Sequence, residues 1–316
     1  MLAQLRTAWR LQRFELIVLI GACGVLAVGS LLVAWQLGGA ERELRACYQT
    51  SPESSAPGWP CRGIESWVAT LSSVRQVLLG VTAAIPFALG LFLGAPLIAR
   101  EIERRTAPIA WSLSPSRRSW FGRRTISVAA IVALALLLVG QAAEVLILAT
   151  EGEVIGFRHF AMHGPLLAVR GVAVLAIGIL VGLVLGRMLP AILLTGLAVV
   201  ALLGGLQIAR SELMRSEAVW LEPAAEIGSS IEMVYDTGFR VDATGELLTY
   251  DEAFERYPEE LGPVGEGIVP GTSVMVLANP PEQYLSFVAR EATALLLVTL
   301  VTATAATWLI GTRRPE

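Results

Sequence analysis

Residues 94–124 read GAPLIAREIERRTAPIAWSLSPSRRSWFGRR and separate two long apolar runs. The first run ends in an Arg/Glu cluster, which a Thr-Ala-Pro break follows. A short segment with Trp111 and Trp120 among serines and arginines then leads into the second run. Apolar side chains between charged ones indicate a surface that faces an interface or a partner. The stretch predicts a basic, aromatic hairpin between two membrane-spanning helices, with an inert solvated loop as the alternative.

The composition places the chain among polytopic membrane proteins. Of its 316 residues 54% are hydrophobic and 16% are charged, and the mean hydropathy is +0.63. A soluble domain usually carries about 25% charged residues. All 24 basic residues are arginine, so no lysine is present to reach the phosphates of ATP in a Walker A loop. A conventional P-loop ATPase and Schiff-base chemistry on lysine are therefore excluded.

Six apolar runs meet or approach the roughly 20 residues that a helix needs to cross a bilayer. They cover residues 16–37, 77–99, 126–150, 166–186, 189–209 and 292–310. The fourth and fifth runs are separated only by Gly186-Arg187-Met188-Leu189-Pro190, which predicts a tight turn. We expect six membrane-spanning helices.

The first 15 residues predict a basic amphipathic helix that lies in the membrane interface. Leu2, Leu5 and Trp9 share one helical face, and three arginines form a stripe beside it. A secretory signal is the alternative. However, the run at 16–37 is too long for the apolar region of a signal peptide, and no clear A-x-A-like site follows it.

Arginine is concentrated on one side of the predicted bundle. Thirteen of the 24 arginines, but only four of the 27 acidic residues, lie on one side. They belong to segments 1–15, 100–125 and 313–316 and to position 187. The positive-inside rule therefore predicts that both termini are cytoplasmic. The expected domains are a cytoplasmic interfacial helix (1–15), transmembrane helices one to five (16–209) with the hairpin at 100–125, an extracytoplasmic loop domain (210–285), and helix six with a cytoplasmic tail (286–316).

The predicted outer segments carry two local features. In the first loop, at 38–67, Cys47 and Cys61 lie in a Pro/Ser-rich tract. Because this loop is expected on the oxidising side of the membrane, a disulfide between them is favoured over two free thiols. In the acidic segment 210–285, residues 239–250 predict a β-hairpin about Ala-Thr-Gly-Glu, followed by a short helical turn. The expected fold class is an all-α polytopic membrane protein with a small mixed extracytoplasmic domain between helices five and six.

Few polar side chains fall within the predicted spans. Glu144 and, one turn earlier, Gln141 lie near the outer end of the third span. A carboxylate in a span is costly, which makes these two residues candidates for a translocation path; contact with headgroups or a water-filled vestibule is the alternative. Arg170 lies near a span edge, where snorkelling explains it. His159 and His163 supply too few ligands for a metal site.

Three stretches resemble the membrane subunit of type-2 ABC exporters (ABC-2 type permeases), in their actinobacterial form. The first comprises residues 94–103 with Thr106, Ala110-Trp111-Ser112 and Arg117-Arg118-Ser119-Trp120. The second is VGLVLGRMLPA at 181–191, which resembles the turn between helices four and five. The third is Asn279-Pro280-Pro281 with Tyr284, Phe287 and Glu291, before the last helix. Arg105 stands where the family usually has glycine, which leaves the geometry of the first turn open.

The resemblance implies that two permease copies or paralogues pair above two ABC ATP-binding subunits. The hairpin would hold a coupling helix that sits in a groove of the ATPase. ATP and Mg²⁺ would be bound by the partner, so the chain itself would be neither an enzyme nor a cofactor-binding protein. Glu101 and Glu103 would pair with Arg104, Arg105 or basic groups of the partner; for each single charge, a solvated face is the alternative. The implied coupling residues are Arg100, Glu101, Glu103, Arg104, Arg105, Trp111, Arg117, Arg118 and Trp120.

The function expected on this basis is ATP-driven export of an amphiphilic or hydrophobic substrate (a lipid, natural product or drug) across the bacterial cytoplasmic membrane. Membrane lipids are expected partners, and nucleic acid is not. A permease-like sensor or scaffold that binds an ABC ATPase without moving cargo is the alternative. An intramembrane protease is disfavoured because neither His nor Asp occurs in the six runs. The sequence does not identify the cargo or distinguish a homodimer from a heterodimer.

Overall fold

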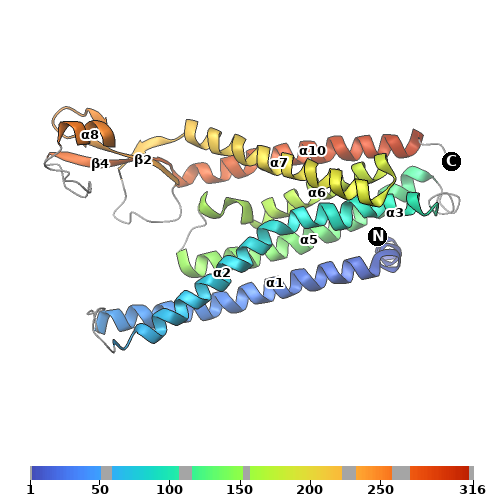
Figure 1. Ribbon diagram of the computed structural model, residues 1–316, viewed down its shortest axis with the longest axis horizontal. Helices are drawn as coiled ribbons and strands as arrows, with labels where there is room; N and C mark the ends of the chain where they lie inside the picture. Colours follow the sequence, from blue (N-terminus) through green and yellow to red (C-terminus); the bar gives the residue numbers. More distant parts are fainter. Residues whose placement is uncertain are drawn as a thin grey trace. The chain divides into compact units, whose positions relative to one another are not determined.

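The computed structural model describes residues 2–50, 59–106, 116–151, 157–222, 233–257 and 271–312, without the side chains of 2–13, 150, 151, 158, 233 and 234. Six helices in these ranges are long and apolar enough to cross a membrane, which confirms the predicted number of spans (Figure 1). They are α1 (Leu2–Thr50), α2 (Arg62–Leu89) with its continuation η1 (Gly90–Gly94) and α3 (Ala95–Glu103), α5 (Arg117–Glu151), α6 (Gly164–Leu185), α7 (Met188–Ser216) and α10 (Tyr284–Thr312).

The chain divides into two compact units. The helical unit comprises Met1–Thr150, Ala161–Gly205 and Arg290–Glu316, and the loop unit comprises Glu151–Phe160 and Leu206–Ala289. Within the helical unit, we call the end where α3 stops and α5 starts the hairpin end. The other end, where α1 stops and α2 starts, is the far end.

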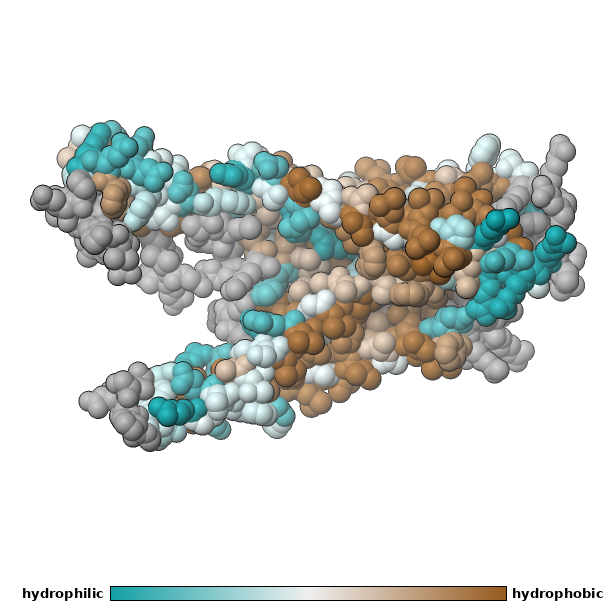
Figure 2. All heavy atoms as spheres, viewed as in Figure 1, coloured by the Kyte–Doolittle hydropathy of each residue, from teal (hydrophilic) through white to brown (hydrophobic). Residues whose placement is uncertain are grey.

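The core of the helical unit lies along α5 and α6. Val132 and Leu136 of α5 are fully buried, and they belong to one apolar cluster with Leu167 and Leu175 of α6. By contrast, α1, α7 and α10 expose large apolar side chains, among them Trp35, Leu197 and Leu300. Figure 2 shows a broad apolar surface over these helices. Such a surface requires lipid or another protein chain beside it.

The expected outer loop at 38–67 is largely helical, so this prediction is wrong. The apolar run ends at Leu37, but α1 continues to Thr50 because a helix that leaves the membrane needs no apolar residues. Arg45 Nη2 lies 3.5 Å from Glu41 Oε2, one helical turn earlier, and this ion pair supports the helical extension. Leu37 and Leu71 of α2 are buried against each other in the same small cluster.

The predicted disulfide between Cys47 and Cys61 is confirmed, and it joins the end of α1 to the start of α2. The Cα atoms of the two cysteines are 5.9 Å apart. At the other end of α1, the residues predicted to form an interfacial helix are helical and continue into the first span without a break.

The loop unit contains a four-stranded antiparallel sheet in the order β1-β4-β2-β3. Its strands are β1 (Val219–Leu221), β2 (Met233–Val241), β3 (Leu247–Thr249) and β4 (Thr272–Asn279). The predicted hairpin is confirmed, with Phe239 paired to Leu248. Helix α7 extends to Ser216, beyond the domain boundary expected at residue 210, and the sequence did not predict strands β1 and β4.

Short helices complete the loop unit. The predicted helical turn is α8 (Tyr250–Arg256). Its N-terminus has a capping box, in which the side chains of Thr249 and Glu252 each accept a hydrogen bond from the other residue's backbone N–H. Of the 3-10 helices, η3 (Pro281–Gln283) belongs to the loop unit, and η2 (Phe157–Met162) begins in it. Asn279 is fully buried, and its side-chain amide donates to the carbonyl of Met214, 2.9 Å away. This bond connects the end of β4 to the end of α7.

Candidate functional site

The turn after α3 is a Schellman motif. The N–H of Thr106 donates to the carbonyl of Glu101 at 3.0 Å, and the N–H of Arg105 donates to the carbonyl of Ile102 at 3.0 Å. Arg105 has φ = 58°, in the left-handed region that glycine adopts most easily. The position where the resembled family usually has glycine therefore keeps a glycine-like conformation, which answers the question that the sequence left open.

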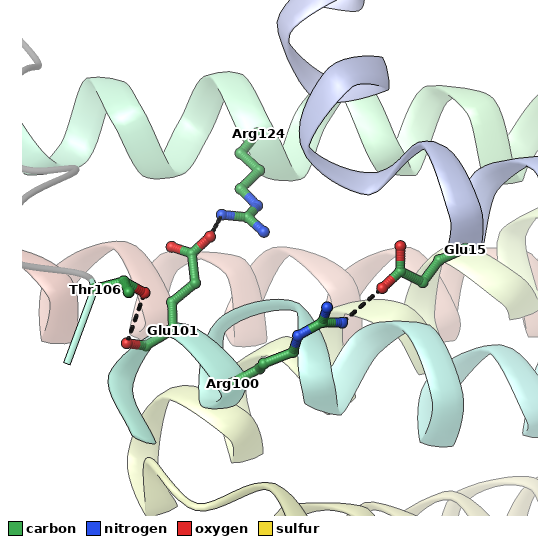
Figure 3. Close-up of polar contacts among 5 residues, drawn as sticks. All are labelled: Glu15, Arg100, Glu101, Thr106 and Arg124. Atoms are coloured by element: carbon green, nitrogen blue, oxygen red, sulfur yellow. Dashed lines mark hydrogen bonds and ion pairs between the residues drawn. The ribbon is translucent and has the colours of Figure 1, made fainter. Parts of the chain in front are cut away.

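Two ion pairs connect this turn to neighbouring helices (Figure 3). Arg100 Nη1 lies 2.7 Å from Glu15 Oε1 of α1. Arg124 of α5 pairs with Glu101, and its side chain is only 9% exposed. Glu101 thus pairs with a residue at the start of α5 and not with Arg104 or Arg105, the two partners within the chain that the sequence suggested.

The third charged side chain of the turn contacts α7. Glu103 Oε2 accepts a hydrogen bond from the backbone N–H of Met188 at 2.9 Å. Met188 is the first residue of α7, where an unpaired N–H and the helix dipole favour a carboxylate. Two residues before Met188, Gly186 has a left-handed backbone with φ = 60° and ends α6. This is the tight turn that the sequence predicted.

One aromatic side chain of α5, Trp120, packs beside the ion pair of Arg124 and Glu101. The guanidinium of Arg124 lies 5.5 Å from the centre of the Trp120 ring, a cation–π geometry. Trp120 is partly buried against the apolar core, and Arg117 is half-buried. Trp111 lies outside the described residues. Every predicted coupling residue that the structure places is therefore at the hairpin end.

The charges at the hairpin end are divided between paired acids and exposed arginines. Each of the three acids described there, Glu15, Glu101 and Glu103, has a partner within the chain. Arg104, Arg105 and Arg118 are exposed, and no described carboxylate pairs with any of them. The surface that this end presents is therefore basic.

A glycine seam holds the last turns before the hairpin against α6. At Gly178 and Gly182 an added Cβ would lie 2.5 Å from the carbonyl oxygen of Gly90 and 2.3 Å from that of Ala95. The two backbones therefore touch directly, as small residues allow in membrane helices. The segment Gly90–Gly94 is π-helical, and the N–H of Ala95 donates to the carbonyl of Gly90.

The two candidate translocation residues meet at the far end. Gln141 Nε2 donates to Glu144 Oε2 at 2.8 Å, and the backbone N–H of Gly164 donates to Glu144 Oε1 at 2.6 Å. His163 Nδ1 lies 2.9 Å from the same oxygen. Glu144 is 9% exposed. The carboxylate therefore binds the N-terminus of α6, an anchoring contact that the sequence did not indicate.

A buried ion pair connects α6 to α10. Arg170 Nε donates to Glu291 Oε1 at 2.7 Å, and both side chains are largely buried. The prediction that Arg170 snorkels to the surface is wrong, because its guanidinium is neutralised within the helical unit. Glu291 lies two turns inside α10, which starts at Tyr284, and so it does not stand before the last helix as the sequence suggested.

Sequence reasoning missed the glycine seam and the pair of Arg170 with Glu291. The seam had a signal, because Gly90-x-x-x-Gly94 and Gly178-x-x-x-Gly182 both carry the spacing of close-packed membrane helices. The ion pair had only the general signal that a charged residue inside a span needs a partner.

Comparison with known proteins assigns the chain to a family. A family model described as "ABC-2 membrane transporter related" matches residues 16–210, which is more than half of the chain. The matched residues include the first four spans, most of the fifth, and the turn after α3. No curated protein and no solved structure matches the chain.

Proposed function

The chain belongs to the ABC-2 membrane transporter related family, and from that premise we propose that it is the permease subunit of an ATP-driven ABC exporter. The hairpin end faces the cytoplasm and docks on a separate ATP-binding subunit, which hydrolyses ATP. The absence of lysine from the sequence supports this division of labour, because the chain lacks the Walker A residue that contacts the phosphates.

The observation that carries the proposal is the set of contacts around the turn after α3. Arg100, Glu101 and Glu103 contact α1, α5 and α7, respectively. A displacement of this turn is therefore transmitted to three other helices through short polar contacts. Closure of the ATPase pair moves the turn, and the turn moves the spans.

Electrostatics support the same docking surface. The acids of the hairpin end are paired within the chain, while Arg104, Arg105 and Arg118 are exposed. Complementary charge guides encounter and fixes the register of an interface. The partner surface is accordingly acidic where it meets Arg105 and Arg118.

The interior of the helical unit supports an amphiphilic or hydrophobic cargo. Among the described residues, the buried carboxylates of its spans are Glu144 and Glu291, and both have partners. The described residues therefore offer no row of free charges of the kind that an ion pathway uses. The apolar faces of α1, α7 and α10 supply surface for a second permease copy and for lipid.

The test is to co-express the chain with a neighbouring ABC ATP-binding subunit and to reconstitute the complex in vesicles. Arg118→Glu is expected to weaken co-purification of the subunit and to abolish cargo-stimulated ATP hydrolysis. Arg62→Glu makes the same charge change at an exposed position of the far end and should leave both unchanged. Equal behaviour of the two variants contradicts the proposed docking surface. ATPase association without export of any amphiphilic cargo favours a sensor or scaffold.

A further inference from the structure

A cavity of about 190 Å³ lies beneath the turn after α3. Its polar wall includes the two ion pairs of Figure 3, Arg100 with Glu15 and Arg124 with Glu101, together with Arg104. Its other wall is apolar and comes from the membrane-spanning segment before the turn. The apolar lining residues are Phe92, Leu93, Pro96 and Leu97.

Two buried polar atoms of the cavity lining are unsatisfied. Arg124 Nε and Glu101 Oε2 have no hydrogen-bond partner among the described residues. The Arg124 side chain is nine-tenths buried, so its Nε–H is shielded from bulk water. A buried charged donor left without a partner is costly. One of the two atoms is a donor and the other an acceptor, so together they favour neither an anion nor a cation, and the preference is set by the other charges of the lining.

The charge of the cavity favours an anion. Three arginines and two glutamates line it, and both glutamates are already paired with arginine. Arg104 is the cation in excess, since no described carboxylate contacts it. Residues 107–115, which follow in the sequence, contain no charged residue that would neutralise it.

The apolar wall identifies the anion as part of an amphiphile. Phe92 is 68% exposed and belongs to a span, so it faces the hydrocarbon layer beside the cavity. We propose that the cavity binds the phosphate of an anionic phospholipid from the leaflet at the hairpin end. The phosphate pairs with the guanidinium of Arg104, and an acyl chain lies along Phe92 and Pro96. A carboxylate of a soluble partner would leave the apolar wall uncovered.

The site does not depend on transport, so it is tested by binding. The full chain is purified in detergent, stripped of lipid and titrated with phosphatidylglycerol, with bound lipid counted by native mass spectrometry. Arg104→Ala is expected to weaken binding about tenfold, the effect of one charge-assisted hydrogen bond. Arg105→Ala removes an equal charge from the next residue, which does not line the cavity, and should change binding less than about twofold.

Further arms separate the lipid from other occupants. Phosphatidylcholine should bind more weakly than phosphatidylglycerol, and glycerol phosphate, which lacks acyl chains, should not compete at equal concentration. The proposal is overturned if Arg104→Ala binds like the unaltered chain, if Arg105→Ala weakens binding equally, or if glycerol phosphate competes fully. It is also overturned if no lipid binds and Arg104→Ala alone weakens ATPase association, because the cavity then receives a carboxylate of the partner.

Discussion

The carboxylate of Glu103 accepts a hydrogen bond from the backbone N–H of Met188, 85 residues later in the chain. The last turn of α3 is thereby fastened to the first turn of α7. Arg100 and Glu101 lie on other faces of the same short helix and contact α1 and α5. The turn is thus a junction of four helices and not a free loop.

Replacement of Glu103 by alanine should loosen this junction. The N–H of Met188 loses its charged acceptor at a helix N-terminus, and the expected loss of stability is about 1 kcal/mol. Cargo-stimulated ATP hydrolysis by the reconstituted complex should fall more than basal hydrolysis. Glu103→Gln keeps an oxygen acceptor and should retain most of the coupling. If the glutamine and alanine variants are equally impaired, the hydrogen bond is not what matters.

Glycine at position 105 should stabilise the turn. Arg105 has a left-handed backbone that is unfavourable for a residue with a Cβ, so Arg105→Gly is expected to add about 0.5–1 kcal/mol. The measurement is unfolding in SDS, followed by tryptophan fluorescence. Arg104→Gly removes the same charge from a residue with φ = −81° and should be neutral or destabilising. A gain in both variants would point to charge removal as the cause.

The glycine seam predicts a position-specific effect of one methyl group. At Gly182 an added Cβ overlaps the carbonyl oxygen of Ala95, so Gly182→Ala should force α6 and α3 apart at a cost of about 1–3 kcal/mol. At Gly80 of α2 an added Cβ meets nothing within 4 Å, and Gly80→Ala should gain up to about 1 kcal/mol of helix propensity. Thermal unfolding in detergent compares the two. A stabilising Gly182→Ala would contradict the close contact.

Local patterns in the sequence sufficed for the spans and the β2–β3 hairpin. An apolar run of about 20 residues and a glycine turn between alternating strands each determine structure over a short window. The end of α1 was misjudged because the charged residues after Leu37 were interpreted as a loop, although a helix also forms in water. Strand β4 was missed because its partners β1 and β2 lie far away in the sequence.

The contacts of the candidate site depend on which helices are neighbours, and spacing along the chain does not reveal this. The charged residues near the hairpin were identified from the sequence, but the partners of Glu101 and Glu103 belong to α5 and α7. The left-handed backbone of Arg105 was also hidden. There the hydrogen bonds of the Schellman turn outweigh the residue's own preference for a right-handed backbone.

The pair of Arg170 and Glu291 lends itself to a double-mutant cycle, because its members are 121 residues apart and both largely buried. Arg170→Leu or Glu291→Leu alone leaves one charge unpaired, so each should cost about 3–5 kcal/mol in SDS unfolding. The variant with both substitutions should unfold close to the unaltered chain, because two apolar side chains remove both desolvation penalties. Additive losses in the double variant would show that the two charges do not stabilise each other and that each serves a separate contact.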